Sequence, residues 1–280
     1  MSTDTTFLEF TQYEARRMWH GDHLKKSLRK AEKFASFGDH STRVISGYKP
    51  SDVHAFFDYL SAQRLSDNTV NHYAAMLTKC FKQAVKAEVI DHAPQFTWRR
   101  VVASQRPLYY TQEQLTAIER WFTHSAQPWI EHFVIIGHQT GMRLGEICKI
   151  NRSTVTTDDN GHSWIYLDTT KNGSERFVPA NKRTMKAIEA LDYDCGNHFH
   201  EKKFYSTWKR MRRAVLKGNK NYVFHTLRHT AATVMANDLH ANTTVIGLLL
   251  GHRSEKTTNK YIKAKPKALQ ALAAQMALMN

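Results

Sequence analysis

The chain has little cysteine and no long apolar run. Its three cysteines, Cys80, Cys148 and Cys195, are scattered over 280 residues. Thiols this few and this far apart exclude a disulfide framework or a cysteine cage for zinc, and they fit a reducing compartment. No apolar stretch approaches the about 18 residues that a membrane span needs, and no secretory leader opens the sequence. We therefore expect a cytoplasmic protein without a membrane partner.

Acidic residues are also scarce. Asp and Glu number 25 against 40 Lys and Arg, which gives a formal net charge of +15. The excess is uneven, with +4 over residues 1–103 and +11 over residues 104–280. Such a charge favours a polyanionic partner, nucleic acid above all, although a ribosome-associated or simply soluble basic protein has a similar composition.

The first hundred residues predict helices only. Apolar residues recur at helical spacing over residues 21–38, 49–63 and 66–90. Ser51 is the expected N-cap of the second helix. About 15 residues precede the first expected helix, too few to form a further domain. The pattern breaks around Pro107, just before a capping box of Thr111 and Gln114. We therefore place a helical domain at residues 1–103 and a second domain at residues 104–280.

The second domain mixes helices and strands. Residues 128–141 predict an apolar helix that ends at Gly141. Residues 153–180 predict short strands joined by the turns "DDNG" and "KNGS", whose Asn-Gly pairs favour positive φ. Helices resume at residue 182. The expected fold class is mainly α, with an all-helical first domain and a mixed α/β second domain that holds a small antiparallel β-sheet.

The stretch "FHTLRHTAATVMA" places two histidines on one helical face. His225 and His229 have the i, i+4 spacing of some zinc sites, so a zinc-dependent hydrolase is one hypothesis. However, Arg228 lies on the same face as His225, and the stretch holds no Cys, Asp or Glu. A fixed positive charge repels a metal ion, so we expect no metal here. His225 and Arg228 instead suit an oxyanion, which a guanidinium binds through two oxygens.

A second candidate anion ligand is Arg143 in "TGMRLGE". It follows the glycine that ends the preceding helix and lies near the start of the next one, where backbone N–H groups also favour negative charge. Glu146, three residues later, is expected to support Arg143. Taken alone, Arg143 is also consistent with a surface residue at a helix start, and His225 with a polar core residue.

In this order, the motifs resemble the tyrosine recombinase (phage integrase) family. The resemblance runs from roughly residue 15 to the C-terminus and includes the hairpin "TKNGSERFVP" with Lys171. It is completed by "LLGH" with His252 and by "TTNKYI" with Tyr261, nine residues later. The hairpin is the least specific motif, and Lys171 is also consistent with a polar turn residue. His252 is also consistent with a residue that ends a helix, and Tyr261 is also consistent with a core aromatic residue.

The resemblance implies the chemistry of DNA strand exchange. The hydroxyl of Tyr261 would attack a DNA phosphate and form a 3′-phosphotyrosine link, with His225 as proton acceptor. Arg143 and Arg228 would bind the phosphate oxygens with a hydrogen bond from His252, and Lys171 would protonate the leaving 5′-oxygen. The resemblance implies no metal, other cofactor or ATP. It also implies a SAM-like core-binding domain and a catalytic domain that clamp duplex DNA.

A basic amphipathic helix is predicted just before the His225 motif. Residues 201–220 hold eight Lys or Arg and one acid. An apolar stripe runs through Phe204, Trp208, Met211 and Val215. The other face is an expected contact with DNA phosphates, although a solvated face is the alternative. Its candidate DNA-binding residues are Lys202, Lys203, Lys209, Arg210, Arg212 and Arg213.

The expected assembly and role also follow from the resemblance. It implies a homotetramer on two DNA sites, whose C-terminal helix contacts either a neighbouring subunit or its own domain. An accessory directionality or DNA-bending protein is a further candidate partner. We expect a minimal integrase without an arm-binding domain, in a bacterial or phage-infected cell. The alternatives are an Xer-like dimer resolvase and a non-catalytic DNA-binding regulator, although the regulator predicts the loss of an arginine or the tyrosine, and all are present.

Overall fold

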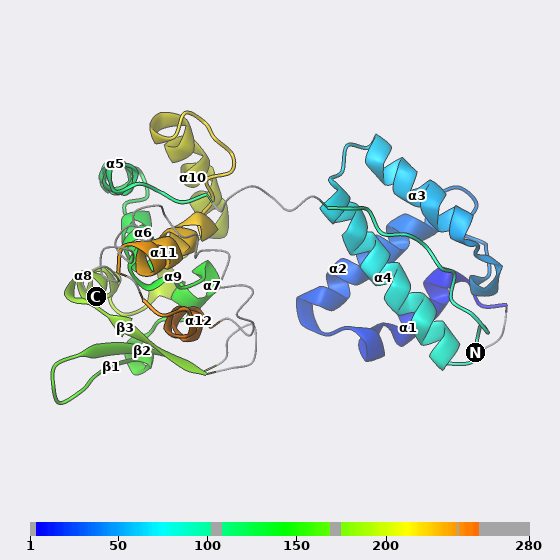
Figure 1. Ribbon diagram of the computed structural model, residues 1–280, viewed down its shortest axis with the longest axis horizontal. Helices are drawn as coiled ribbons and strands as arrows, with labels where there is room; N and C mark the ends of the chain where they lie inside the picture. The colour runs from blue at the N-terminus through cyan, green and yellow to red at the C-terminus, as the bar shows by residue number, and fades with distance from the viewer. Residues whose placement is uncertain (1–3, 102–107, 169–174, 240, 252–280) are drawn as a thin grey trace, which may run out of the picture. The chain divides into compact units, whose positions relative to one another are not determined.

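The computed structural model of the chain describes residues 4–101, 108–168, 175–239 and 241–251 (Figure 1). The chain divides into two compact units, Met1–Ala103 and Ser104–Asn280. Over the described residues the structure is mainly helical, with a three-stranded antiparallel sheet in the second unit. The predicted fold class is therefore confirmed. None of the helices in these ranges has both the length and the apolar character that crossing a bilayer requires.

The first unit is built from helices, as predicted. Its described elements are α1 (Phe7–Met18), α2 (Gly21–Ala35), the 3₁₀ helix η1 (Ile45–Gly47), α3 (Pro50–Ala62) and α4 (Asp67–Lys86).

Helix α1 was not predicted, and it begins earlier than the first expected helix. Its start is a capping box, in which the Glu9 backbone N–H donates to Thr6 Oγ1 at 3.3 Å and the Thr6 N–H donates to Glu9 Oε2 at 3.0 Å. The helix also buries Phe7 and Phe10 completely. The capping pair and the two aromatic residues were present in the sequence as signals of this helix.

Helix α3 begins two positions earlier than expected. Lys49 is its N-cap and Pro50 its first residue, so Ser51 lies inside the helix and is not the cap. Proline favours this first position because its fixed φ suits the helix and its missing N–H would have no partner there. The Lys49 N–H instead donates to Asp52 Oδ2 at 2.7 Å.

An aromatic core holds the first unit together. The ring centroids of Phe7 and Phe34 are 4.9 Å apart, and those of Phe34 and Phe56 are 5.0 Å apart. Both pairs meet edge to face, which the charge distribution of aromatic rings favours.

The chain then leaves α4 and returns along it. There the Asn71 side chain bonds both the N–H and the carbonyl of Arg99, each at 2.8 Å.

The second unit surrounds its apolar core with helices and a small sheet. Its helices are α5 (Gln112–Thr123), α6 (Trp129–Thr140), α7 (Leu144–Ile147), η2 (Arg152–Thr154), α8 (Lys182–Glu189), α9 (Cys195–His198), α10 (Glu201–Val215), α11 (His225–Asn237) and α12 (Thr243–Leu250). Its strands are β1 (Val155–Thr157), β2 (Ser163–Leu167) and β3 (Arg176–Ala180), in the order β1-β2-β3.

The hairpin between β1 and β2 forms at the predicted turn. Gly161 has φ +80°, which an L-residue rarely adopts, and Asp158 Oδ1 accepts the N–H groups of Asn160 and His162 at 3.0 and 2.8 Å. The second predicted turn, "KNGS", lies outside the described residues. Strands β2 and β3 pair Ile165 with Val178, and both of these side chains are buried in the core.

Helix α6 lies at the centre of the second unit. It is packed against α5, α8, α11 and β3 (Figure 1). Helix α11 approaches it closely at Gly137, where an added Cβ would lie 3.0 Å from the Phe224 ring and 3.1 Å from Leu227 Cδ1. Helix α12 in turn contacts both α11 and β3. The ends of α6 and α12 and the start of α11 therefore come together in one region.

The predicted end of α6 at Gly141 is confirmed. Gly141 adopts φ +68°, and its N–H donates to the Gly137 carbonyl at 3.0 Å. An added Cβ would lie only 2.5 Å from Leu250 Cδ2 of α12, and Leu250 is completely buried. The absence of a side chain at this position therefore lets α12 approach the end of α6.

We expect the Gly141→Ala substitution to lower the free energy of unfolding by about 2–4 kcal/mol, because left-handed backbone strain adds to a steric clash with Leu250. Urea denaturation followed by circular dichroism measures the loss. Gly161→Ala is the matched control, since Gly161 also has positive φ but nothing within 4 Å of the added Cβ. Equal losses in the two variants would contradict the close approach of α12.

Candidate functional site

Arg143 lies between two helices. After Gly141 the backbone is extended at Arg143, with φ −74° and ψ 149°, and α7 starts at the next residue. Its backbone N–H donates to Glu146 Oε2 at 2.8 Å, and its Nη1 donates to Glu146 Oε1 at 2.7 Å. The Arg143 side chain keeps 25% of its surface exposed. The guanidinium is thus held at its base and remains accessible from outside.

Glu146 is the centre of this arrangement and is itself buried. The second hydrogen-bond partner of the Glu146 carboxylate is Arg176. Its Nη2 donates to Oε2 at 2.8 Å, and its Nη1 donates to Oε1 at 3.2 Å. Burial alone would raise the pKa of Glu146. The hydrogen bonds from Arg176 and Arg143, together with the positive charge of Arg176, outweigh burial and hold the pKa of Glu146 below its ordinary value. The carboxylate therefore stays ionised.

Arg228 is buried within the second unit, with 2% of its surface exposed. It lies one helical turn after His225 in α11. Its Nη1 donates to the Gly141 carbonyl at 2.9 Å, and its Nη2 donates to the Leu250 carbonyl at 2.5 Å. Hydrogen bonds from a charged donor are stronger than neutral ones. Arg228 therefore ties the end of α6 to the end of α12, and it brings its positive charge to the region that holds Arg143.

His225 is the first residue of α11, and part of its surface is exposed while neighbouring groups displace water from the rest of its ring. Its ring centroid is 4.8 Å from that of His229, with the two planes at 86°. Loss of water around the imidazole lowers the pKa of His225 below its ordinary 6.5, and the positive charges of Arg228 and Arg143 lower it further, against the effect of Glu146. The ring is therefore neutral at pH 7 and able to accept a proton.

We expect the His225 imidazole to titrate below pH 6.5 in the free protein. The unfolded chain binds this proton at higher pH than the folded chain, so the folded state loses stability as pH falls below 6.5. Proton NMR of the histidine rings measures the pKa, with His225→Gln to assign the signal. Arg143→Gln should move the pKa of His225 upward, because it removes a nearby positive charge. A pKa of His225 at or above 6.5 in the unmodified protein would contradict this electrostatic arrangement.

Arg176 is the residue of this region that we did not predict from the sequence. It begins β3, where Arg176, Val178 and Ala180 are buried and Phe177 and Pro179 are exposed. A charged residue in register with the buried face of a strand was the available signal, since arginine is seldom buried without a partner. Its partner, Glu146, lies 30 residues away.

Three predicted catalytic residues, Lys171, His252 and Tyr261, lie outside the described residues. The described chain reaches Gly251, which ends α12 with φ +66°. The structure thus brings Arg143, Glu146, His225 and Arg228 into one region. The roles of all seven residues stay predictions. Over residues 4–101, 108–168, 175–239 and 241–251, no three His, Cys, Asp or Glu side chains converge as metal ligands would.

Helix α10 has the predicted amphipathic form. Phe204, Trp208 and Met211 are buried, and the Trp208 ring lies 5.6 Å from that of Phe122 and 5.5 Å from that of Phe224. The exposed candidate DNA-binding residues are Lys202, Lys203, Lys209, Arg210 and Arg213. Arg212 differs from them because it is half-buried and its Nη1 donates to the Lys220 carbonyl at 2.7 Å. Its predicted contact with DNA is thus combined with a bond that holds the following turn.

Known proteins resemble both units. The phage integrase family matches residues 109–268, and the phage integrase SAM-like domain matches residues 6–98. Tyrosine recombinase XerC of Caldanaerobacter subterraneus subsp. tengcongensis is 26% identical over 243 residues, which are 78% of this chain and 65% of that protein. The chain thus spans slightly less than two thirds of this relative's length.

Solved structures share the fold. The Tn1549 transposon integrase in complex with a circular intermediate DNA has a TM-score of 0.75 at 16% identity, covering 97% of this chain and 99% of that chain. XerH bound to its difH substrate has a TM-score of 0.67 at 14% identity, covering 96% and 93%. A lambda integrase dimer bound to a COC′ core site has a TM-score of 0.68 at 15% identity, covering 92% and 79%.

A match to the SAM-like domain in the first unit, followed by a match to the phage integrase family in the second, defines a class of DNA recombination enzymes. Because the first family match covers more than half of the residues, the chain belongs to the phage integrase family, the tyrosine recombinases. The family that the sequence motifs predicted is thereby confirmed.

Proposed function

We propose that this protein is a site-specific DNA recombinase of the integrase and excisionase type, which cuts and rejoins duplex DNA through a 3′-phosphotyrosine intermediate. The observation that carries the proposal is the convergence of Arg143, His225 and Arg228 in one region. In that region the loss of water around the ring, and then the neighbouring positive charge, lower the pKa of His225. A site of two guanidinium groups and one neutral imidazole suits a phosphate that gathers negative charge during attack by a weakly acidic nucleophile.

The proposed reaction has two reversible steps. The Tyr261 oxygen attacks the phosphorus while His225 accepts its proton, and the bond from phosphorus to the 5′-oxygen breaks as Lys171 protonates that oxygen. A 5′-hydroxyl of the second DNA then attacks the phosphotyrosine as Lys171 accepts its proton, and the Tyr261 oxygen leaves as it takes back the proton from His225. One phosphoester replaces another in each step, so the proposed reaction needs no ATP.

Arg143 and Arg228 have different parts in this proposal. Arg143 is partly exposed and offers its guanidinium to a non-bridging phosphate oxygen. Arg228 is buried and contributes its charge while it holds the ends of α6 and α12 together. His252 adds a hydrogen bond in the proposal. Each well-placed donor stabilises the transition state by about 3 kcal/mol.

One face of α10 supports a contact with DNA. Lys202, Lys209 and Arg213 are separated by seven and four residues, so they line a single face of the helix. This face lies opposite the buried Phe204 and Met211. The three residues are exposed. We infer that they follow the DNA backbone, with Lys203 and Arg210 beside them.

We expect alanine substitution of Lys202, Lys209 or Arg213 to weaken DNA binding and to make the plot of log Kd against log salt concentration less steep by about one unit per residue. Fluorescence anisotropy with a labelled duplex at several salt concentrations measures both effects. Lys186→Ala is the control, because Lys186 is an exposed lysine on α8. Loss of affinity with an unchanged salt dependence would show that these residues do not neutralise phosphates.

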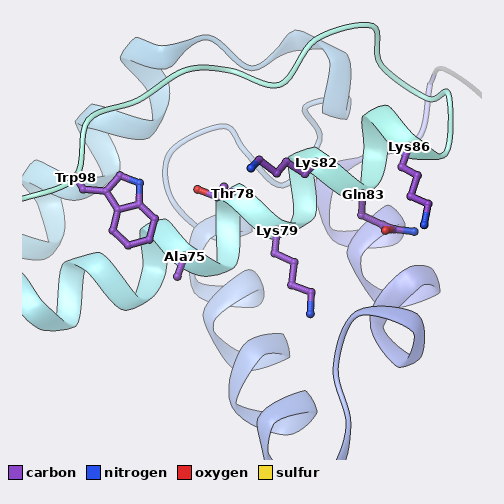
Figure 2. A pocket seen from close by; sticks show the side chains of 7 residues that line it. All are labelled: Ala75, Thr78, Lys79, Lys82, Gln83, Lys86 and Trp98. Carbon is purple, nitrogen blue, oxygen red and sulfur yellow. The ribbon is translucent and has the colours of Figure 1, made fainter. Parts of the chain in front are cut away.

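The first unit has its own basic groove on α4. Lys79, Lys82 and Lys86 leave successive turns of the helix, and Trp98 of the returning segment lines the same groove (Figure 2). The Lys79 ammonium group donates to the Met18 carbonyl, whereas Lys82 and Lys86 are exposed. Trp98 is 51% exposed and lies toward Ala75, at the other end of the groove from Lys86 (Figure 2). An exposed aromatic ring and lysines along one groove suit a nucleic-acid surface. We infer that residues 1–103 bind the core DNA site and that residues 104–280 carry the chemistry.

The partners follow from the same proposal. The Tn1549 integrase structure is a complex with a circular intermediate DNA, and XerH is bound to its difH substrate. The lambda integrase structure is a dimer bound to a COC′ core site. We propose duplex DNA as the substrate and a homotetramer on two sites as the active assembly. In this assembly the C-terminal segment 265–280 would contact a neighbouring subunit. An accessory directionality or DNA-bending protein is a further proposed partner. The cytoplasm of a bacterial or phage-infected cell is the proposed location.

The test is trapping of the covalent intermediate. Nicked duplexes carrying candidate attachment sites are incubated with the protein in EDTA, and the products are separated on denaturing gels. We expect a protein–DNA adduct at the 3′ end of the cut strand, and none with Tyr261→Phe. An adduct that persists in full with Tyr261→Phe would show that Tyr261 is not the nucleophile. An adduct that forms only with added metal would overturn the proposed mechanism.

A further inference from the structure

Arg176 has an unusual environment for an arginine. Only 7% of its side chain is exposed, and both of its Nη groups donate to the buried carboxylate of Glu146. Its Nε is also buried and has no hydrogen-bond partner among the described residues. A buried charge without its pairing is costly. The Glu146 carboxylate is thus the main compensation for the Arg176 charge.

The guanidinium of Arg176 also lies against the end of α12. An added Cβ at Gly251 would be 2.7 Å from Arg176 Nη1 and 3.2 Å from its Cζ. Gly251 has φ +66° and follows Leu250, whose carbonyl accepts a hydrogen bond from Arg228. Arg176 therefore packs on the same helix end that Arg228 holds by hydrogen bonding.

Arg176 restricts how Glu146 and Arg143 can pair. Arg176 bonds both carboxylate oxygens, whereas the Arg143 guanidinium has one bond, from Nη1 to Oε1 at 2.7 Å. Without Arg176, the carboxylate would be available for a two-bond pair with Arg143, which is the preferred geometry of arginine with a carboxylate. Such a pair would turn the Arg143 guanidinium toward Glu146.

We propose that Arg176 is a positioning residue of the recombination site: it occupies Glu146 so that Arg143 stays directed at the phosphate, and it supports the end of α12. This inference rests on the proposed function for the reaction itself, but it concerns an arrangement present in the free protein. Arg176 is not proposed as a phosphate ligand, because its side chain is buried and both of its Nη groups are bonded to Glu146. It acts on the reaction through Arg143.

The first test needs no DNA. The charged groups that face His225 are Arg228, Arg143 and Glu146. Arg176→Gln removes a positive charge from Glu146 and leaves the negative charge of its carboxylate less compensated. The NMR-measured pKa of His225 should therefore rise relative to the unmodified protein. The matched control is Arg183→Gln, which removes another arginine paired with a buried glutamate, Glu119, in the same unit. An unchanged pKa of His225 in Arg176→Gln would overturn the proposal.

The second test uses cleavage of the nicked duplex. Arg176→Gln should lower the maximal rate of adduct formation about 100-fold, because a small displacement of Arg143 is enough for such a loss. The DNA concentration for half-maximal rate should change less than twofold, and Arg183→Gln should match the unmodified protein. A higher DNA concentration for half-maximal rate, with an unchanged maximal rate, would make Arg176 a DNA ligand and overturn the proposal.

Arg176→Lys provides a second test if Arg176→Gln does not fold, because lysine keeps the positive charge but not the two-bond geometry. Its maximal rate should fall about tenfold, and a rate equal to that of the unmodified protein would overturn the proposal. If the unmodified protein forms no adduct on any duplex, the proposed function fails, while the pKa of His225 still decides whether Arg176 controls the site.

Discussion

Replacing Arg228 with lysine should lower the rate of covalent DNA cleavage by about 100- to 1000-fold and should also destabilise the protein. Lysine keeps the positive charge, but its single ammonium group is not a planar fork that reaches the carbonyls of Gly141 and Leu250 together. Loss of one bond from a charged donor at this buried position should lower the free energy of unfolding by about 2–3 kcal/mol. Single-turnover cleavage of the nicked duplex and urea denaturation measure the two effects.

Arg210→Lys is the control for Arg228→Lys. Arg210 is exposed on α10, and its Nη2 donates to Thr207 Oγ1 at 3.2 Å. The control should keep its unfolding free energy within about 0.5 kcal/mol of the unmodified protein, as exposed substitutions do. Normal stability in Arg228→Lys would contradict the role of Arg228 in joining the ends of α6 and α12.

Replacing Arg143 with glutamine should also lower the cleavage rate by about 100- to 1000-fold, but with little loss of stability. Glu146 retains its two bonds from Arg176 in this variant, and the Arg143 side chain is partly exposed. We therefore expect the free energy of unfolding to fall by about 1 kcal/mol or less. The same two measurements, made beside those of Arg228→Lys, separate a phosphate ligand from a residue that also supports the fold.

The two arginine variants should thus differ in stability: both lose cleavage rate, but only Arg228→Lys should lose much free energy of unfolding. If Arg143→Gln cleaves DNA at the normal rate, Arg143 does not bind the reacting phosphate. If it unfolds as readily as Arg228→Lys, its main role is structural and the proposed division between the two residues is wrong.

Local signals in the sequence predicted much of the fold. Gly141 was recognised as the end of α6 because a left-handed residue is needed there, and the turn at residues 158–161 was recognised by its Asn-Gly pair. Thr111 and Gln114 form the predicted capping box at the start of α5. Each of these features depends on residues within a few positions of each other. Helix α1 has the same kind of local signal in its capping box of Thr6 and Glu9.

The candidate site depends on contacts that no local pattern contains. Arg228 and the Gly141 carbonyl are 87 residues apart in sequence, and Arg176 and Glu146 are 30 residues apart. The motifs placed Arg143, His225 and Arg228 together through family resemblance. They did not indicate that Arg228 is buried or that Glu146 is shared by two arginines. Those features arise only when α6, α7, β3 and α12 pack together.

The most direct test of the account is to identify the residue that becomes attached to DNA. The adduct formed on the nicked duplex is trimmed with nuclease, digested with protease and sequenced by tandem mass spectrometry. We predict a nucleotide 3′-phosphate on the oxygen of Tyr261. Attachment to any other residue, or a cleaved strand with no attached peptide, would contradict the proposed mechanism.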